Sequence, residues 1–213
     1  ILMYSADIEK KELDIPAHKS GYSEHADTIY ALTVAIDTKD HYTFKHSQHV
    51  AFYASELAKA ANMTPELIEI VREAGFLHDI GKIGVPDNII NKPGKLTDEE
   101  FAAMKEHTSI GGKILESLNS LDSISYGALY HHERFDGKGY PKGLSGEDIP
   151  LFGRIICVAD ALDAMTSNRA YRNHLSIEKV LSEIENGKGT QFDPIVADAL
   201  LELIRRNEIV LHE

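Results

Sequence analysis

Five histidines and two aspartates recur along the chain at spacings that a helical protein can bring together. They are His46, His78, Asp79, His107, His131, His132 and Asp160. Imidazole nitrogens and carboxylate oxygens are good ligands for divalent transition metals, and this set is large enough to hold two ions. Two such ions can activate water and neutralise charge on a phosphoryl group. The residue types therefore predict hydrolysis of a phosphate ester at a metal centre.

Adjacent polar residues support this interpretation more strongly than any single histidine does. A lone histidine such as His46 is more often a hydrogen-bonded core residue than a metal ligand. His78-Asp79 and His131-His132, in contrast, are doublets in otherwise apolar surroundings. Because a buried polar group without a partner is costly, both doublets need partners in the folded chain. Metal ions would provide them.

Two predicted helices carry His46 and the first doublet. One face of a helix over about 43–61 contains His46, His49, Val50, Tyr53 and Leu57. His46 therefore faces the core. A second helix begins at Thr64-Pro65, with threonine as the N-cap and proline in the first turn, and ends at His78-Asp79. Both residues can turn toward one centre at a helix end, where Asp79 could bridge two metals.

A third predicted helix carries His107. Thr97 and Glu100 have the spacing of a capping box, in which each side chain satisfies a free backbone amide of the first turn. His107 then lies between Met104 and Ile110 on the apolar face of this helix. We expect it to point inward, toward the other candidate ligands.

The last candidates lie in two later segments. A helical segment from about 123 leads to His131-His132. Pro150 opens another helix, whose apolar run over 155–159 ends at Asp160. A carboxylate in such a run is difficult to explain without a nearby cation.

The segment 133–149 is predicted to be a loop that reads the substrate. It contains four glycines and a proline and has no helical period. Arg134, Lys138 and Lys142 supply positive charge for phosphate, and Tyr140 supplies a face for stacking. An ordinary solvated surface loop is the alternative. The attachment of this segment to the His131-His132 doublet favours the substrate-binding interpretation.

Composition limits the classes of partner. The formal net charge is −12, which argues against general binding to a nucleic-acid backbone. A small anionic substrate remains compatible with this charge if metal ions supply the positive field. The single cysteine, Cys157, lies among apolar residues and is predicted to be a core residue without a catalytic role.

The fold is predicted to be all-α, because helical periodicity continues almost to the end of the 213 residues and convincing strand patterns are absent. We expect a linker or extension over 1–22 and one domain over 23–213. The first residue is isoleucine, so we expect the chain to derive from a longer protein. No apolar run reaches the roughly 18 residues of a membrane span, and no signal peptide is evident, which predicts a cytoplasmic domain.

Several of these motifs, in this order, resemble the HD-GYP domain, a subgroup of the HD metal-dependent phosphohydrolases. The resemblance covers about 40–205 and rests on His46-Ser47, His78-Asp79-Ile80-Gly81-Lys82, His107-Thr108, Gly111-Gly112, His131-His132-Glu133, Gly139-Tyr140-Pro141, Val158-Ala159-Asp160-Ala161, Asp163-Ala164-Met165-Thr166, Arg169, Tyr171-Arg172 and Thr190-Gln191-Phe192-Asp193-Pro194. It implies a bundle of helices around a di- or trinuclear metal centre. It also implies hydrolysis of cyclic di-GMP to pGpG and, in many members, on to GMP.

The resemblance assigns roles residue by residue. His46, His78, Asp79 and Asp160 correspond to ligands of one metal, and Asp79, His107, His131 and His132 to ligands of the second. Asp79 would bridge the two ions, which the resemblance implies to be iron or manganese. Asp79 and Lys82 are the implied catalytic residues, with attack by a hydroxide that bridges the metals. The implied substrate-binding residues are Lys82, Arg134, Lys138, Gly139, Tyr140, Pro141, Arg169 and Arg172.

Two positions depart from the family pattern. Members with a third metal carry a glutamate four residues before the first histidine, where this chain has Tyr42, so we expect a dinuclear site. His49 replaces the arginine that the family usually has three residues after the first histidine. A local substitution is the simpler interpretation of His49, and a role beside His46 is the alternative.

Three alternatives remain open from the sequence. The domain could bind cyclic di-GMP or, through the Gly-Tyr-Pro loop, a diguanylate cyclase (GGDEF) domain with negligible turnover. It could also hydrolyse another nucleotide. An upstream sensory domain is expected, and a helix that contains Ile29, Leu32, Val34 and Ile36 could form a homodimer contact.

Overall fold

The computed structural model describes residues 45–116, 122–167 and 174–211, together with Ala31, Val34, Ile36 and Lys39. Several features of the sequence predictions lie outside these residues, among them Tyr42, Arg169, Arg172 and the proposed extension over 1–22. The division of the chain at residue 22 stays a prediction.

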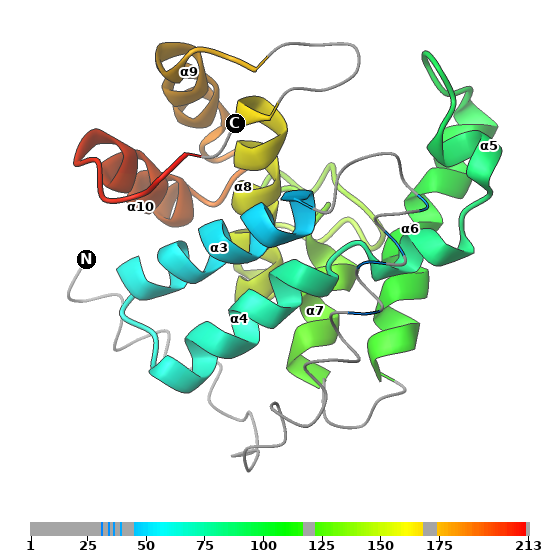
Figure 1. The fold of residues 1–213 in the computed structure, drawn as a ribbon, viewed down its shortest axis with the longest axis horizontal. Coiled ribbons are helices and arrows are strands. Elements are labelled where there is room, and N and C mark those ends of the chain that lie inside the picture. Colours follow the sequence, from blue (N-terminus) through cyan, green and yellow to red (C-terminus); the bar gives the residue numbers. More distant parts are fainter. Residues whose placement is uncertain are drawn as a thin grey trace.

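The described part of the chain is a bundle of helices, which confirms the all-α prediction (Figure 1). The longer helices are α3 (Lys45–Ala60), α4 (Pro65–Leu77), α6 (Asp98–Glu116), α7 (Asp122–Tyr130), α8 (Leu151–Thr166), α9 (Ile177–Gly187) and α10 (Pro194–Arg205). Short elements are η1 (Ile80–Gly84), α5 (Asp87–Ile90) and η2 (Gly146–Asp148). Lys188 and Phe192 form an isolated bridge, and no longer strand occurs among the described residues.

The packing of α3, α4, α7 and α8 forms the centre of the bundle. α4 lies against α3 and α7, and α8 contacts α3 and α7 from the other side (Figure 1). Tyr53, Leu57, Ile156 and Leu162 are among the fully buried side chains of this core. Cys157 is buried within it, as predicted, and burial raises the pKa of its thiol to about 12. None of the described helices is long and apolar enough to cross a membrane.

Local capping explains where several helices begin. The Thr64 hydroxyl accepts a hydrogen bond from the Leu67 amide, and the following Pro65 opens α4. Thr97 and Glu100 form the predicted capping box at α6: the Thr97 amide donates to Glu100 Oε2 at 2.8 Å, and the Glu100 amide donates to Thr97 Oγ1 at 3.3 Å. These caps satisfy amides that would otherwise lack partners in the first turn.

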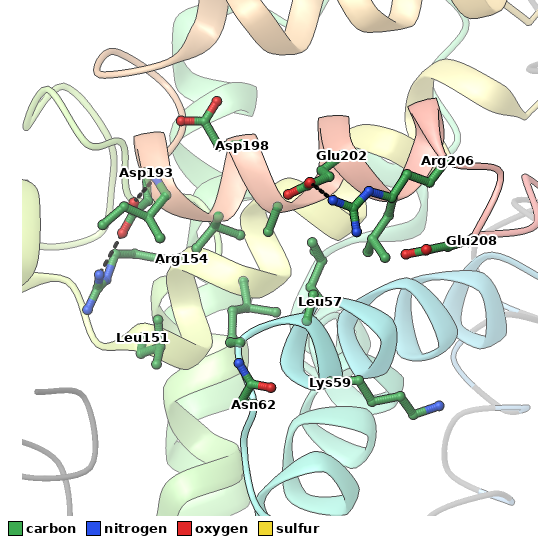
Figure 2. Close-up of a pocket in the computed structure, with 17 residues that line it drawn as sticks. Leu57, Lys59, Asn62, Leu151, Arg154, Asp193, Asp198, Glu202, Arg206 and Glu208 are labelled. Carbon is green, nitrogen blue, oxygen red and sulfur yellow. Dashed lines mark hydrogen bonds and ion pairs between the residues drawn. The ribbon is translucent and has the colours of Figure 1, made fainter. Parts of the chain in front are cut away.

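The N-terminus of α10 is tied to α8 by a buried ion pair. Arg154 Nη1 donates to Asp193 Oδ2 at 2.6 Å, and the other oxygen of Asp193 accepts the Ile195 amide at 2.7 Å. Figure 2 shows this pair at one end of a cavity of about 500 Å³ that lies between α3, α8 and α10. Asp193 thus acts as helix cap and as tertiary contact together.

Ile36 lies in the hydrophobic core. Its side chain is 5% exposed and packs with residues of the central helices. Ile36 thus contributes to the core, and the homodimer contact stays a prediction. Ile29 and Leu32, which belong to the same prediction, lie outside the described residues.

Glu73 on α4 yields a prediction about stability and pH. Its side chain is 7% exposed and its Oε2 atom has no hydrogen-bond partner. Burial raises the pKa of this carboxyl to about 7 from an ordinary value of 4.5. As pH rises, Glu73 loses its proton in the unfolded chain at about pH 4.5 but keeps it in the folded protein up to about pH 7. The free energy of unfolding therefore falls between these two pH values.

We therefore expect Glu73→Gln to raise the melting temperature at pH 8 by on the order of 2–4 °C. The gain should shrink toward pH 5, where Glu73 is neutral in the folded state and no longer carries a buried charge. Thermal unfolding of both proteins between pH 5 and pH 8 tests this. A difference that does not change with pH would contradict it.

Candidate metal centre

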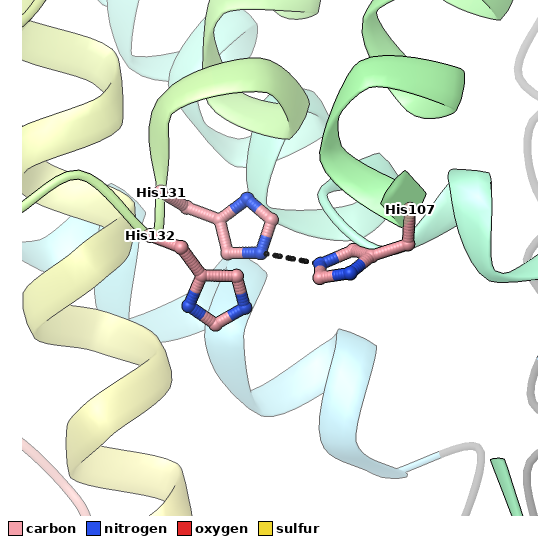
Figure 3. Close-up of side chains that lie close together, drawn as sticks. All are labelled: His107, His131 and His132. Carbon is pink, nitrogen blue, oxygen red and sulfur yellow. Dashed lines mark hydrogen bonds between the residues drawn. The ribbon is translucent and has the colours of Figure 1, made fainter. Parts of the chain in front are cut away.

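The predicted ligands converge from five parts of the bundle. α3 contributes His46, the end of α4 contributes His78 and Asp79, α6 contributes His107, the residues after α7 contribute His131 and His132, and α8 contributes Asp160. Two groups have ligand atoms that lie within 4.8 Å of one another: His46 with His78 and Asp79, and His107 with His131 and His132. Figure 3 shows the second group, in which the three imidazoles face one another.

Asp79 lies between the two groups. Its Oδ2 atom is 3.3 Å from His78 Nε2 and 3.8 Å from His46 Nε2. Its Oδ1 atom is 3.5 Å from His107 Nε2 and 3.9 Å from His131 Nε2. One carboxylate oxygen therefore faces each group, which is the arrangement that a carboxylate bridging two ions requires.

Asp160 lies beside His46 of the first group, and its charge also acts on His132 of the second group. Its Oδ1 atom is 3.5 Å from His46 Nε2. Its side chain also lines a cavity of about 620 Å³ together with His131 and His132. Asp160 is thus positioned to complete a ligand set with His46, and it borders the space in front of both groups.

Backbone carbonyls orient three of the histidines. The Nδ1 atom of His78 is 2.7 Å from Gly75 O, that of His107 is 2.7 Å from Met104 O, and that of His131 is 3.0 Å from Ala128 O. A carbonyl can only accept, so each Nδ1 carries a hydrogen, and the ring turns its Nε2 atom toward the centre. This orientation presents Nε2 as the atom that would bind a metal.

The buried Nε2 atom of His78 has no hydrogen-bond partner. An orphaned buried nitrogen is costly, and a divalent ion bound between the ligand groups would satisfy it. The donor set is nitrogen and oxygen only, which suits iron or manganese as well as zinc. The residues present therefore fit a metal centre.

Charge at the centre favours ligation. Burial would raise the pKa of Asp79, but the Lys82 ammonium and His78 hold it well below its usual range. Burial lowers the pKa of His132 to about 4 and that of His131 well below its usual value. At neutral pH the second group thus offers the neutral imidazoles of His131 and His132 beside the ionised Asp79 carboxylate, the protonation states that metal binding requires.

The pKa of His78 indicates that the same site attracts a cation. Its burial lowers the pKa, yet the neighbouring Asp79 carboxylate outweighs burial and raises the pKa of His78 to about 9. The local field therefore favours a positive charge at this nitrogen, whether that charge is a proton or a metal ion.

Lys82 lies one turn beyond Asp79, on η1. Its ammonium is 2.8 Å from Asp79 Oδ2. Lys39 supports this turn from another part of the chain, since its Nζ atom donates to Ile83 O at 2.8 Å and to Val85 O at 2.7 Å. About 40 residues separate Lys39 from η1, and no motif in the sequence connects the two.

Asp163 is a positioning residue to which the sequence motif alone assigned no role. It is 1% exposed, and it accepts hydrogen bonds from His46 Nδ1 at 2.7 Å and from His49 Nδ1 at 2.7 Å. Its Oδ1 atom also accepts from Ser167 Oγ at 2.9 Å. Asp163 therefore fixes His46 with its Nε2 toward Asp79, as the carbonyls do for the other histidines. The spacing of Asp160 and Asp163, one turn apart on α8, was an available signal.

Glu133 holds the glycine-rich loop in place. It is 2% exposed, and its Oε1 atom accepts the amides of Lys142 at 2.7 Å and Gly143 at 3.0 Å. Oε2 accepts the Leu144 amide at 3.1 Å. A Cβ on Gly139 would lie 2.3 Å from the backbone nitrogen of Arg134. Only glycine therefore allows the loop to approach its first residues so closely.

The predicted substrate-binding residues differ in their positions. Arg134, Lys138, Gly139 and Tyr140 line the cavity of about 620 Å³, whereas Lys82 and Pro141 are not part of its lining. The guanidinium of Arg134 is already paired with Asp136 through contacts of 3.0 and 2.9 Å. Lys138 is 80% exposed at the rim. Arg134 is thus less free to bind phosphate than its charge alone indicated.

We expect Asp163→Asn to weaken metal binding by about 10- to 100-fold, because an amide cannot accept from two imidazoles through two equivalent oxygens. Metal content and calorimetric titration of the metal-free protein with Mn²⁺ measure the effect, and circular dichroism confirms the fold. Ser167→Ala, which removes one hydrogen bond to the same carboxylate, serves as the mild control. Wild-type Mn²⁺ affinity in Asp163→Asn would contradict the role of Asp163.

Comparisons with known proteins identify a family and several relatives. The model of the HD domain family matches residues 31–196. A cyclic di-GMP phosphodiesterase of Thermotoga maritima is 41% identical over 188 residues, which cover 85% of this chain and 51% of that protein. A 3′3′-cGAMP-specific phosphodiesterase of Vibrio cholerae is 38% identical over 176 residues, which cover 82% of this chain and 34% of that protein.

Solved structures show the same fold. The crystal structure of a cyclic GMP-AMP specific phosphodiesterase of Vibrio cholerae superposes with a TM-score of 0.67 at 19% identity, covering 85% of this chain and 49% of that one. The chain thus spans about half the length, or less, of the relatives described here.

Proposed function

This chain belongs to the HD domain family, in its HD-GYP subgroup, and we propose that it is a metal-dependent phosphodiesterase that hydrolyses cyclic di-GMP. The observation that carries the proposal is Asp79, whose two oxygens each face a separate group of histidines at 3.3 to 3.9 Å. The relative from Thermotoga maritima, which is named for this substrate, supports it.

The proposal includes two metal sites that share Asp79. One ion would be held by His46, His78, Asp79 and Asp160, and the other by Asp79, His107, His131 and His132. Iron or manganese is the proposed metal, because the nitrogen and oxygen donors suit either ion and the resemblance to HD-GYP domains favours them over zinc. The low pKa of Asp79 keeps its carboxylate available to both ions at neutral pH.

Two divalent ions supply an activated water and neutralise charge on the phosphoryl oxygens when they are bound. The chain's own residues would do the rest. Lys82, now 2.8 Å from Asp79 Oδ2, has a flexible stem that can turn its ammonium toward a phosphoryl oxygen. Tyr140, stacked on His132 with ring centroids 4.8 Å apart, would hold the sugar and base side of the substrate near the metals. The 3′ oxygen leaves, and the product is linear pGpG.

We expect Lys82→Met to lower kcat for cyclic di-GMP by about 100-fold or more, since it removes a donor that acts on developing charge. Metal content should not change, because Lys82 is not a ligand. Lys113→Met, at an exposed position on α6, is the matched control. Turnover of Lys82→Met at the wild-type rate would remove Lys82 from the mechanism.

The proposed activity itself is tested with protein that is purified without oxygen and loaded with Fe²⁺ or Mn²⁺. Chromatography of cyclic di-GMP after incubation should show pGpG or GMP, and Asp79→Ala should abolish both products. Intact substrate in the presence of confirmed metals would contradict the proposal. Tight binding without products would then favour a binding module, and turnover of 3′3′-cGAMP alone would favour another cyclic dinucleotide as substrate.

A further inference from the structure

We propose that Phe101 and Lys105, on α6, form with Tyr140 a subsite that binds one purine base of the substrate and favours guanine. The inference rests on the proposed function, and it names the residues that would select the base. Neither Phe101 nor Lys105 belongs to the motifs that identified the metal centre.

An aromatic wall runs from the metal centre to the rim of the cavity. His132 stacks on Tyr140, with ring planes 30° apart, and Tyr140 meets Phe101 edge to face, with centroids 6.2 Å apart and planes at 84°. All three side chains line the cavity of about 620 Å³. A cyclic dinucleotide with its phosphate at the metals would extend a base along this wall.

Phe101 presents ring surface to this space. It is 47% exposed, and it is one of six exposed large apolar side chains among the residues that the structure describes. Of those six, Phe101 is the one that lines the cavity beside the proposed metal ligands. An exposed aromatic face beside a polar site suits stacking with a nucleobase, which stacks on such faces in single-stranded nucleic-acid proteins.

Lys105 places a positive charge at the same wall. Its Nζ atom lies 5.2 Å from the centroid of the Phe101 ring and 5.8 Å from that of Tyr140. Attraction between the ammonium and the two rings holds the side chain over the wall. An ammonium can only donate hydrogen bonds. It is therefore positioned to donate to a base that stacks on Phe101.

The donor-only character of Lys105 discriminates between purines. Guanine presents two adjacent acceptors, O6 and N7, whereas adenine presents the N7 acceptor beside an N6 donor. Lysine thus pairs better with guanine. Cyclic di-GMP and 3′3′-cGAMP both contain guanine, so one guanine subsite would accept either, while cyclic di-AMP would bind poorly.

A simpler interpretation is that Phe101 and Lys105 only stabilise α6. They are four residues apart, and such pairs contribute small amounts to helix stability. Under that interpretation their replacement would change the melting temperature slightly and leave substrate kinetics unaltered. The two interpretations therefore predict different kinetic results.

The test compares Phe101→Ala and Lys105→Met with the matched controls Tyr126→Ala and Lys113→Met. Tyr126 is 45% exposed, and Lys113 is exposed on the same helix as Lys105. Each metal-loaded protein is assayed with cyclic di-GMP, 3′3′-cGAMP and cyclic di-AMP, the last also as a competitor. Metal content and hydrolysis of bis(p-nitrophenyl) phosphate, which carries no base, report on the metal centre independently.

For Phe101→Ala we expect KM for cyclic di-GMP to rise about 10-fold with kcat unchanged. The reason is that stacking of the base would stabilise the bound substrate and the transition state by the same free energy. For Lys105→Met we expect kcat/KM for cyclic di-GMP to fall about 10-fold, with little change in the inhibition constant of cyclic di-AMP. The controls, metal content and hydrolysis of the base-free substrate should match wild type.

Three outcomes would overturn the proposal. Wild-type kinetics in both variants would leave Phe101 and Lys105 as helix-stabilising residues and would not affect the proposed function. Equal losses for guanine- and adenine-containing ligands in Lys105→Met would show attraction to phosphate instead of base selection. Absence of turnover by the wild-type protein on all three cyclic dinucleotides, with the base-free substrate still hydrolysed, would refute the subsite and the proposed function together.

Discussion

The close contact between η1 and α6 is the constraint on which the centre depends. A Cβ atom on Gly81 would lie 1.8 Å from the carbonyl oxygen of His107 and 2.5 Å from the Gly111 nitrogen. No side chain fits there, so the two backbones can touch only with glycine at this position. This contact sets Asp79 beside His107 while the end of α4 keeps it beside His78. The position of the Asp79 carboxylate between the two groups of histidines therefore depends on the missing side chain of Gly81.

Orientation of the histidines uses the backbone more than other side chains. His78, His107 and His131 each donate from Nδ1 to a carbonyl within the preceding turn, so their tautomers follow from helix geometry alone. His46 instead donates to Asp163, which also accepts from His49. One ligand therefore depends on a carboxylate from α8. The bundle supports that ligand through tertiary packing, and the His49 imidazole takes part in the same network.

The features that depend on residues close together in the sequence, such as helix caps and helix faces, were predictable from it. Thr64 and Thr97 are recognisable as helix caps in the sequence because a cap depends on a few adjacent residues. The inward face of α3 followed from the spacing of its apolar residues, and the doublets identified the centre. Contacts between distant segments were not predictable in this way. Lys39 reaches the carbonyls of η1, and Asp163 reaches His46, only because of how the helices pack. The pairing of Arg134 with Asp136 likewise depends on the conformation of the loop, which its glycines leave open in the sequence.

The three amide hydrogen bonds to Glu133 have a consequence for the thermodynamics of binding. They give the glycine-rich loop its shape through a buried carboxylate that belongs to the chain itself. The conformational entropy of this segment is therefore lost when the protein folds, before any ligand arrives. A ligand that enters the cavity meets a wall that is already ordered, and its affinity is not reduced by the freezing of a flexible loop. In calorimetric terms, the loop contributes to the heat of unfolding and little to the entropy of association.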